Sequence, residues 1–339
     1  MAAVSINGYL CYTAYQTESL LYRKGMKELG KIDTVTKEYM KDPVIFADVF
    51  NKFLYHGKQV IKPESLIEMD STEIVVPYGE GKAGVPEQKY RDALKLMMTD
   101  GNIAYCILGC EDQSRVHYAM PVKNMLYDSM QYARQVTKAA KSHRQEKEHK
   151  PSSGEFLGGF YKTDRLIPVV TLVIYWGPDR WDGPLTLREM YAAADDAVMQ
   201  YVPDYKINLI APEQMTEDEI KEFKSSLKEV MLYIKYSKDK AKLQEIAQED
   251  PNFLSMDRQA AEVINVTTNS RLKYPEGKET INMCLAIEEM RNESRLEGEI
   301  KGAVETCKNF NKTLEETIQY ISDNFTVQQA EEEVKKYWK

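Results

Sequence analysis

The stretch KYRDALKLMMTDGNIAYCILGCEDQS, residues 89–114, predicts a β-hairpin that carries two acidic side chains. Asp100-Gly101 separates two apolar runs, and an Asp-Gly pair supplies the positive backbone dihedral angles of a type I′ turn. With these two residues as the loop, Asp92 pairs with Gly109. Because side chains alternate along a strand, Asp92 and Glu111 are then diagonal neighbours on one face of the sheet.

This arrangement allows a metal site. Diagonal Cβ atoms lie roughly 7–8 Å apart, a span that two carboxylates can bridge by binding one divalent cation. Two acids on one face repel each other unless a positive charge neutralises them, and Gly109 leaves room for an ion. The spacing therefore allows Mg²⁺ or Mn²⁺ at Asp92 and Glu111, but by itself it fits a solvated sheet face at least as well.

The residues around the hairpin predict an α/β core. Residues 44–54 place phenylalanines at helical spacing, and residues 120–147 form one long helical pattern. The apolar run LIPVVTLVIYW, residues 166–176, is typical of a strand covered on both faces. Residues 186–202 have a helical pattern, and residues 205–212 indicate a further strand. Strands that alternate with helices indicate an α/β fold.

The remaining segments complete the domain map. Residues 151–160, PSSGEFLGGF, predict a loop of small side chains. Beyond the core the chain is rich in helix-forming residues with few β-branched runs. We therefore predict an α/β domain over residues 1–212 and a helical C-terminal region over residues 213–339. Its Gly298 and Gly302, one helical turn apart, would permit close packing in a homo-oligomer.

Composition narrows the function classes. The 339 residues include 45 Lys and Arg and 53 Asp and Glu, a net charge of −8, with 43% hydrophobic residues, as in an ordinary globular chain. No apolar run reaches the roughly 18 residues of a membrane span, and the N-terminus lacks a signal-peptide pattern, so we expect a cytoplasmic protein without a membrane partner. The cysteines and histidines show no metal-ligand spacing, so a metal ion would be held by carboxylates.

Three segments together resemble a known family. They are KYRDALK with Asp92, YCILGCEDQS with Glu111-x-Gln113, and the helical MPVKNMLYDSMQYARQ directly after it. They are similar to the PD-(D/E)XK nuclease-type transposases, the recombination-promoting nuclease (Rpn) family. FADVFNKFLYHGKQVI, VVTLVIYWG and INMCLAIEEMRNESRLEGEIKG extend the resemblance over nearly the whole chain. The resemblance implies a restriction-endonuclease-like mixed sheet flanked by helices and a Mg²⁺- or Mn²⁺-dependent DNA endonuclease activity.

The resemblance also implies roles for individual residues. Asp92 and Glu111 would bind the metal ion, which polarises the scissile phosphate and lowers the pKa of an attacking water. Gln113 stands where the superfamily usually has lysine, and an amide cannot supply a positive charge. Lys123, early in the next helix, is a candidate replacement cation, with a surface lysine as the alternative. Asp48 is a candidate third acid, although a one-faced helix would turn it towards water.

A net acidic chain that binds DNA needs a local basic surface. Between residues 131 and 150 there are six bases and two acids, and we predict phosphate contacts from Arg134, Lys138, Lys141 and Arg144. A solvated helix end is the alternative. Because of Gln113, a second hypothesis is a catalytically degenerate, oligomeric DNA- or protein-binding protein that keeps the nuclease fold.

Overall fold

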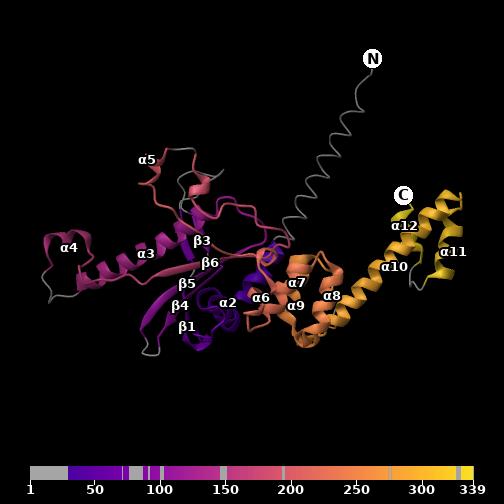
Figure 1. Cartoon of the computed structure of the whole chain (residues 1–339), viewed down its shortest axis with the longest axis horizontal. Helices are drawn as coiled ribbons and strands as arrows, with labels where there is room; N and C mark the ends of the chain where they lie inside the picture. The colour runs from indigo at the N-terminus through magenta and orange to yellow at the C-terminus, as the bar shows by residue number, and fades with distance from the viewer. Residues whose placement is uncertain are drawn as a thin grey trace, which may run out of the picture. The chain divides into compact units, whose positions relative to one another are not determined.

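The computed structural model describes residues 30–70, 72–75, 87–90, 92–99, 103–145, 151–192, 195–273, 275, 277–325 and 330–338. The chain divides into two compact units (Figure 1). The first comprises Met1–Leu243 and Asp257–Asn269, and the second comprises Gln244–Met256 and Ser270–Lys339. All residues predicted for the site lie in the first unit.

A five-stranded mixed sheet is the main sheet of the first unit, with strand order β1-β4-β5-β6-β7. Strands β1, β4 and β5 pair antiparallel, whereas β5, β6 and β7 are parallel. A separate antiparallel pair consists of β2 and β3. The α/β class with a mixed sheet is confirmed. The strands are β1 (Leu66–Glu68), β2 (Thr72–Val75), β3 (Glu87–Tyr90), β4 (Ala93–Met98), β5 (Ala104–Gln113), β6 (Val169–Tyr175), β7 (Asn208–Ile210), β8 (Met256–Asp257) and β9 (Thr280–Ile281).

The hairpin of β4 and β5 exists, but its predicted register is wrong. Gly109 pairs with Leu94 and so does not lie opposite Asp92. Continuing the observed pairing beyond the start of β4 places Asp92 opposite Glu111 instead. The difference is two residues, and a slip of two keeps each side chain on its predicted face of the sheet.

The register differs because the connection is not a simple two-residue loop. The pairing shifts between Met97 and Met98, and the Thr99 amide donates to the carbonyl oxygen of Ile103 at 2.9 Å. The predicted turn at residues 100–101 lies outside the described residues. An irregularity of this kind near the end of a hairpin changes the register of the whole ladder.

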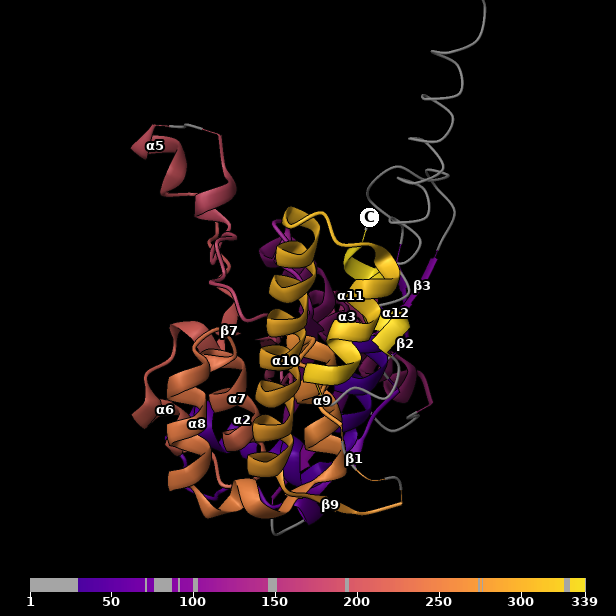
Figure 2. The same ribbon diagram turned by 90° about the vertical axis from the view of Figure 1, so that its right-hand side faces the viewer.

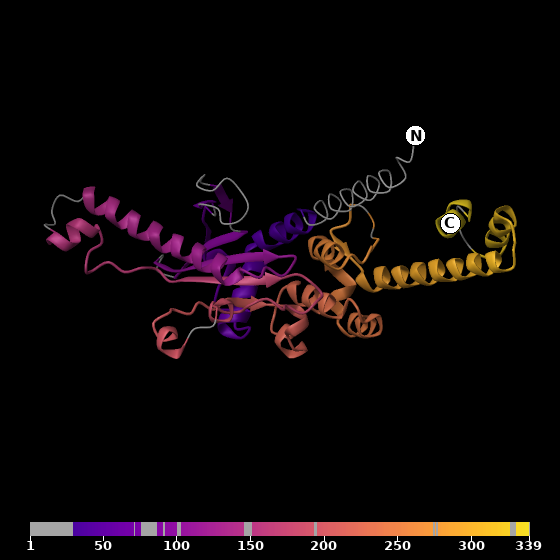
Figure 3. The same cartoon turned by 90° about the horizontal axis from the view of Figure 1, so that it is seen from above.

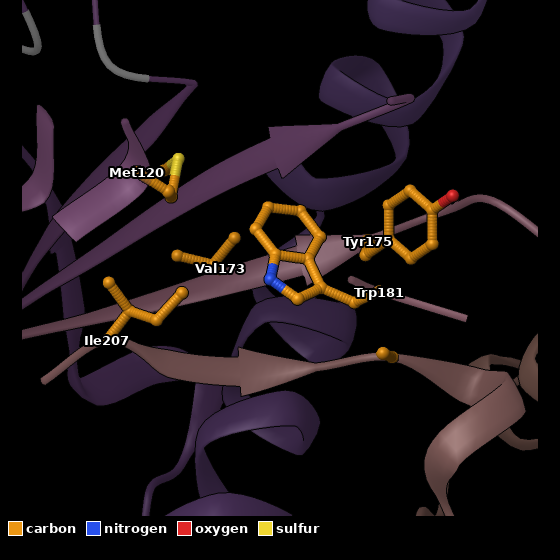
Figure 4. Close-up of a cluster of buried hydrophobic side chains, with 6 residues drawn as sticks. Met120, Val173, Tyr175, Trp181 and Ile207 are labelled. Carbon is orange, nitrogen blue, oxygen red and sulfur yellow. The ribbon is translucent and has the colours of Figure 1, made fainter. Parts of the chain in front are cut away.

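One face of the sheet is covered by the long helix α3 (Met120–Gln145), which confirms the helix predicted there. Met120 packs with Val173, Tyr175, Trp181, Ile207 and Ala211 in a buried cluster over β6 and β7 (Figure 4). This cluster fixes the start of α3 above the sheet. The far half of α3 continues beyond the sheet edge (Figure 3).

The other face is covered by helical residues 30–41 and by α2 (Pro43–Tyr55), which confirms the predicted first helix. Lys95 on β4 donates to the carbonyl oxygen of Lys41 at 3.0 Å, and its ammonium lies 5.3 Å from the centre of the Phe46 ring. Tyr39 meets Trp176 edge to face with ring centres 6.4 Å apart. The sheet is therefore covered by helices on both faces.

Two segments differ from their predictions. The predicted loop at 151–160 contains the helix α4 (Ser153–Gly158), which begins with a capping box of Ser152 and Glu155. Residues 186–202 are predicted as a helix, but their described part, 186–192 and 195–202, contains only η2 (Arg188–Met190) and the four-residue α5 (Asp196–Met199) as helical elements. They belong to an arm that extends away from the sheet (Figure 2).

The helical C-terminal region is confirmed. In the second unit, α10, α11 and α12 pack around Ile300, Val304, Ile321 and Val334. A Cβ atom at Gly298 or Gly302 would meet nothing within 4 Å, so the predicted oligomer contact stays a prediction. None of the helices in the described ranges is long and apolar enough to cross a membrane. The elements are α6 (Glu217–Lys221), α7 (Leu227–Tyr236), α8 (Lys240–Glu249), α9 (Arg258–Thr268), α10 (Met283–Asn309), α11 (Leu314–Asn324) and α12 (Ala330–Tyr337), with short 3₁₀ turns η1 (Pro63–Ser65), η3 (Pro212–Gln214) and η4 (Pro251–Ser255).

Candidate active site

The two predicted acids lie where β4 begins and β5 ends. Asp92 directly precedes β4, and the backbone amide of Asp112 donates to its Oδ2 at 2.9 Å. Glu111 is fully buried near the end of β5. In an antiparallel hairpin these two ends meet at the same edge, so the strand pairing itself brings the acids together.

Lys123 from α3 reaches this edge of the sheet. Its ammonium nitrogen lies 2.9 Å from Oε2 of Glu111, and the lysine side chain is largely buried. Burial lowers the pKa of Lys123, but the charge and hydrogen bond of Glu111 more than offset this, so the pKa is raised overall. The structure thus brings the predicted cation and acid into contact, while the catalytic role of Lys123 stays a prediction.

The environment of Asp92 disfavours its charged form. Burial raises its pKa, and the hydrogen bond from Asp112 and the charges of Lys123 and Lys37 offset this only in part. Lys37 lies 3.9 Å from Oδ1 of Asp92. Asp92 therefore keeps a raised pKa mainly because it is buried, although two lysines lie near it.

The helical residues 30–41 contribute to this edge and were missed by the sequence analysis. Besides Lys37, they supply Asp33, which accepts a hydrogen bond from the Ser114 hydroxyl at 3.1 Å. Asp33 and Lys37 are four residues apart and so share one helix face. The spacing of Asp33 and Lys37, followed by Pro43 at the start of α2, is the sequence pattern that could have indicated a helix beside the site.

Gln113 is half-buried beside the acids, as its alternation with Glu111 requires. Its side-chain nitrogen Nε2 donates to the backbone oxygen of Asp112 at 2.8 Å, and its backbone oxygen accepts from the backbone amide of Trp176 at 2.9 Å. The Gln113 side chain is therefore turned back onto its own strand.

Asp112, between the two predicted site residues, points to the opposite face. Its Oδ1 accepts from the Trp176 indole at 2.9 Å, whereas Oδ2 is buried and has no hydrogen-bond partner among the described residues. Burial raises the pKa of Asp112 well above its usual range, and the nearby charge of Asp92 raises it further. The raised pKa favours the neutral form of Asp112 beside Asp92.

The donor set fits a hard divalent cation. Within the described ranges, no group of three or more His, Cys, Asp or Glu side chains is arranged to hold a metal ion. Mg²⁺ in phosphoryl-transfer sites usually takes one or two protein carboxylates and fills its other positions with water and substrate phosphate oxygens. Asp92 and Glu111 meet this requirement.

The face of α3 that packs on the sheet also carries polar side chains that sequence analysis did not single out. Asp128 accepts hydrogen bonds from the Thr171 hydroxyl at 2.6 Å and the Tyr205 hydroxyl at 2.5 Å. Asn124 is fully buried, and neither of its amide atoms has a hydrogen-bond partner in the described part of the chain. These residues lie four apart, so a polar stripe runs along α3 behind Lys123.

Asp48 has a different environment from the other predicted site residues. Its carboxylate accepts from the backbone amides of Lys224 and Ser225 at 2.8–3.0 Å and from the Ser225 hydroxyl at 2.6 Å. The helical-wheel expectation that Asp48 faces water was wrong, because α2 is covered on more than one side and Asp48 is buried. These bonds tie α2 to the start of α7; a part in catalysis stays a prediction.

The basic residues predicted to contact DNA lie along the far half of α3. Arg134, Lys138 and Lys141 fall on one face of the helix and line a groove of about 430 Å³ together with Met130, Ala133 and Thr137. Arg134 donates weakly to the backbone oxygen of Asp70 at 3.4 Å. Lys138, Lys141 and Arg144 are exposed, and none forms an ion pair with a residue that the structure describes.

Comparison with known proteins identifies the family of the chain. The family model described as "Putative transposase, YhgA-like" matches residues 87–264, more than half of the chain. The match includes every predicted site residue except Asp48. No curated protein and no solved structure matches the chain. The chain therefore belongs to the YhgA-like transposase family.

Proposed function

We propose that this protein is a metal-dependent DNA endonuclease of the recombination-promoting type. Asp92 and Glu111 would form the site at which it hydrolyses phosphodiester bonds. The observation that carries the proposal is the buried Glu111–Lys123 ion pair of 2.9 Å at the point where β4 and β5 meet, with Asp92 beside the same lysine. Membership of a transposase family supports DNA as the substrate.

Asp92 and Glu111 would hold Mg²⁺ or Mn²⁺. When bound, the ion supplies Lewis-acid polarisation of the phosphate and a water of lowered pKa. The raised pKa of Asp92 supports this assignment. Burial and acidic neighbours destabilise the charged carboxylate, and a bound metal ion would stabilise it.

Lys123 would supply the positive charge that Gln113 cannot. Its ammonium lies beside Glu111, so it can neutralise charge that develops on a phosphate bound at the same edge. The amide of Gln113 can orient a water by hydrogen bonding. In this scheme the cation comes from α3, whereas the usual superfamily lysine comes from the strand that bears the acid.

DNA would follow α3 from the site to its basic end. At 1.5 Å per residue, the 18 residues from Lys123 to Lys141 span roughly 27 Å. Successive phosphates of one DNA strand are spaced by 3.4 Å along the axis of the duplex, so this length corresponds to about eight base pairs. By the same arithmetic, Lys138, Lys141 and Arg144 would hold the backbone about seven to nine base pairs from the scissile phosphate.

The test is cleavage of supercoiled plasmid with Mg²⁺ by the wild-type protein, by Asp92→Asn and by Glu111→Gln. Asp218→Asn is the matched control, because Asp218 is an exposed acid of the same unit with no hydrogen bond or ion pair to a described residue. We expect cleavage by the wild type and the control, and none by the two site variants.

Metal binding is measured separately by titration with Mn²⁺ followed by electron paramagnetic resonance. Glu111→Gln should weaken Mn²⁺ binding, while DNA binding without metal stays unchanged or becomes tighter because a negative charge is removed near the phosphate. If the wild type binds DNA but neither cleaves it nor binds Mn²⁺, the protein is the catalytically degenerate binding protein.

A further inference from the structure

Two large apolar side chains are strongly exposed at the far end of the first unit. Phe156 is 80% exposed and Leu157 is 88% exposed, both on α4. We call these two residues the α4 tip. Isolated exposed apolar residues are common on protein surfaces, but two adjacent ones at the end of a projecting element indicate an interaction site.

The α4 helix is firmly fixed at both ends. At its start, Ser152 and Glu155 form a reciprocal capping box, and Glu155 also accepts from the Lys162 amide at 3.1 Å. At its end, Gly159 has φ of +66°, and a Cβ atom there would lie only 2.7 Å from Cβ of Ala140 on α3. The end of α4 therefore lies against the basic half of α3, and Figure 3 shows α4 beside the far end of that helix.

A second set of contacts holds the chain after α4 to the same helix. The His143 ring stacks on Tyr161 with ring centres 3.6 Å apart, and its Nε2 lies 2.8 Å from Oδ2 of Asp164. Gln135 exchanges two hydrogen bonds with the backbone of Ile167 at 2.7 and 3.0 Å. Four side chains thus fix the position of the α4 tip relative to the lysines of α3.

The charge around the α4 tip is positive. Lys141 and Arg144 lie on the adjoining part of α3, and Lys162 follows α4. Among the described residues next to α4, two acids are engaged internally: Glu155 in the capping box, and Asp164 with His143 and the Tyr161 amide. An apolar wedge with flanking cations matches a nucleic acid, whose phosphates surround stacked bases.

We propose that Phe156 and Leu157 insert between base pairs of the duplex whose backbone is held by the basic half of α3, and that they kink it. This inference rests on the DNA binding of the proposed function. Apolar side chains that enter a base step unstack it, and the cost is offset by contacts with flanking phosphates. Pyrimidine–purine steps unstack at the lowest cost. The α4 tip would therefore favour a flexible step about eight base pairs or slightly more from the cleaved bond.

The test uses short duplexes with 2-aminopurine at successive positions, mixed with the full-length protein without divalent metal, so that catalysis plays no part. Unstacking raises 2-aminopurine fluorescence. We expect a rise at one step or two adjacent steps with the wild type and no rise with Phe156→Ser/Leu157→Ser. The double variant should also bind the duplex on the order of tenfold more weakly, because loss of one aromatic stack has about this effect.

The control is Val198→Ser/Tyr201→Ser, which removes a comparably exposed pair, 52% and 83%, from the separate α5 arm. This control should retain the fluorescence rise. The α4 variant should keep the wild-type dependence of affinity on salt, since it removes no charge. Circular dichroism checks that both variants fold, as expected for exposed positions.

Each failure has a distinct meaning. Duplex binding without a fluorescence rise, or a rise that persists in Phe156→Ser/Leu157→Ser, overturns the wedge but leaves the proposed nuclease intact. Absence of any duplex binding overturns both. If the α4 variant instead loses binding to phosphatidylglycerol vesicles while DNA binding is unchanged, the α4 tip is a membrane contact and the inference is wrong.

Discussion

Replacing Lys123 by methionine should strongly destabilise the first unit, because Glu111 would keep its charge in a fully buried position. Removing one partner of a buried ion pair costs about 3–5 kcal/mol. The Lys123 side chain is 21% exposed, which allows some water to reach the site, so we expect about 3 kcal/mol. Methionine keeps most of the lysine stem and its packing, so the loss reports mainly the charge.

The assay is urea-induced unfolding followed by tryptophan fluorescence, since Trp176 and Trp181 are buried in the first unit. The double variant Glu111→Gln/Lys123→Met should recover most of the lost stability, because it leaves no unpaired charge. The matched control is Lys301→Met, which breaks the exposed Lys301–Glu305 pair of 4.0 Å and should cost less than about 1 kcal/mol. If Lys123→Met costs no more than Lys301→Met, the Glu111–Lys123 pair is not the buried interaction described.

Three further predictions follow from the site. Asp92→Asn should lose cleavage and should unfold at a higher urea concentration than the wild type at pH 7. Because burial raises the pKa of Asp92, the free energy of unfolding of the wild type should fall as pH rises from about 4 through that raised pKa. The variant should lack this dependence on pH. Replacing Lys138, Lys141 and Arg144 by glutamine should make the slope of log affinity against log salt on duplex DNA shallower by up to about 2.7, and an unchanged slope would place the DNA path elsewhere. Asp48→Ala should lower the free energy of unfolding by about 2–3 kcal/mol, because the Ser225 and Lys224 amides lose a buried charged acceptor; equal urea midpoints would contradict this role.

The location of the acids could be predicted from sequence, although the register could not. Side chains within β5 point alternately to the two faces of the sheet, so Glu111 and Gln113 must share a face. The pairing with β4 depends on how many residues the turn uses and on the shift between Met97 and Met98, neither of which is written in the Asp-Gly pair. The predicted face remained correct only because the error was an even number of residues.

The two segments that differ from their predictions do so for opposite reasons. Residues 186–202 are rich in helix formers, yet the Leu187 amide donates to the carbonyl oxygen of Tyr205, and Thr186 forms an antiparallel bridge with Lys206. Pairing between the ends of the arm overrides the helical propensity. At α4 the reverse holds, because the signal Ser152-x-x-Glu155 was present but the surrounding glycines indicated a loop.

The environment of Asp48 could not be predicted from its own helix. A helical wheel assumes one buried face, but α2 lies against the sheet on one side and receives residues 224–225 on another. Those residues are about 176 positions away in sequence, so no local pattern signals their approach. A polar residue off the apolar stripe can be a buried acceptor as readily as a solvated one, and only the distant partner decides.

The ion pair of Lys123 suggests why the chain can carry glutamine at position 113. A lysine there would share the face and the edge with Glu111 and would compete with Lys123 for the same carboxylate. Met120 anchors the first turn of α3 in the apolar cluster over β6 and β7, so Lys123 is delivered to Glu111 by packing that does not depend on residue 113. The same helix carries the basic surface in its far half, and the end of α4 lies against it there. A single rigid element thus fixes the distance between the candidate cation and the predicted DNA contacts, and a bend in α3 should uncouple them.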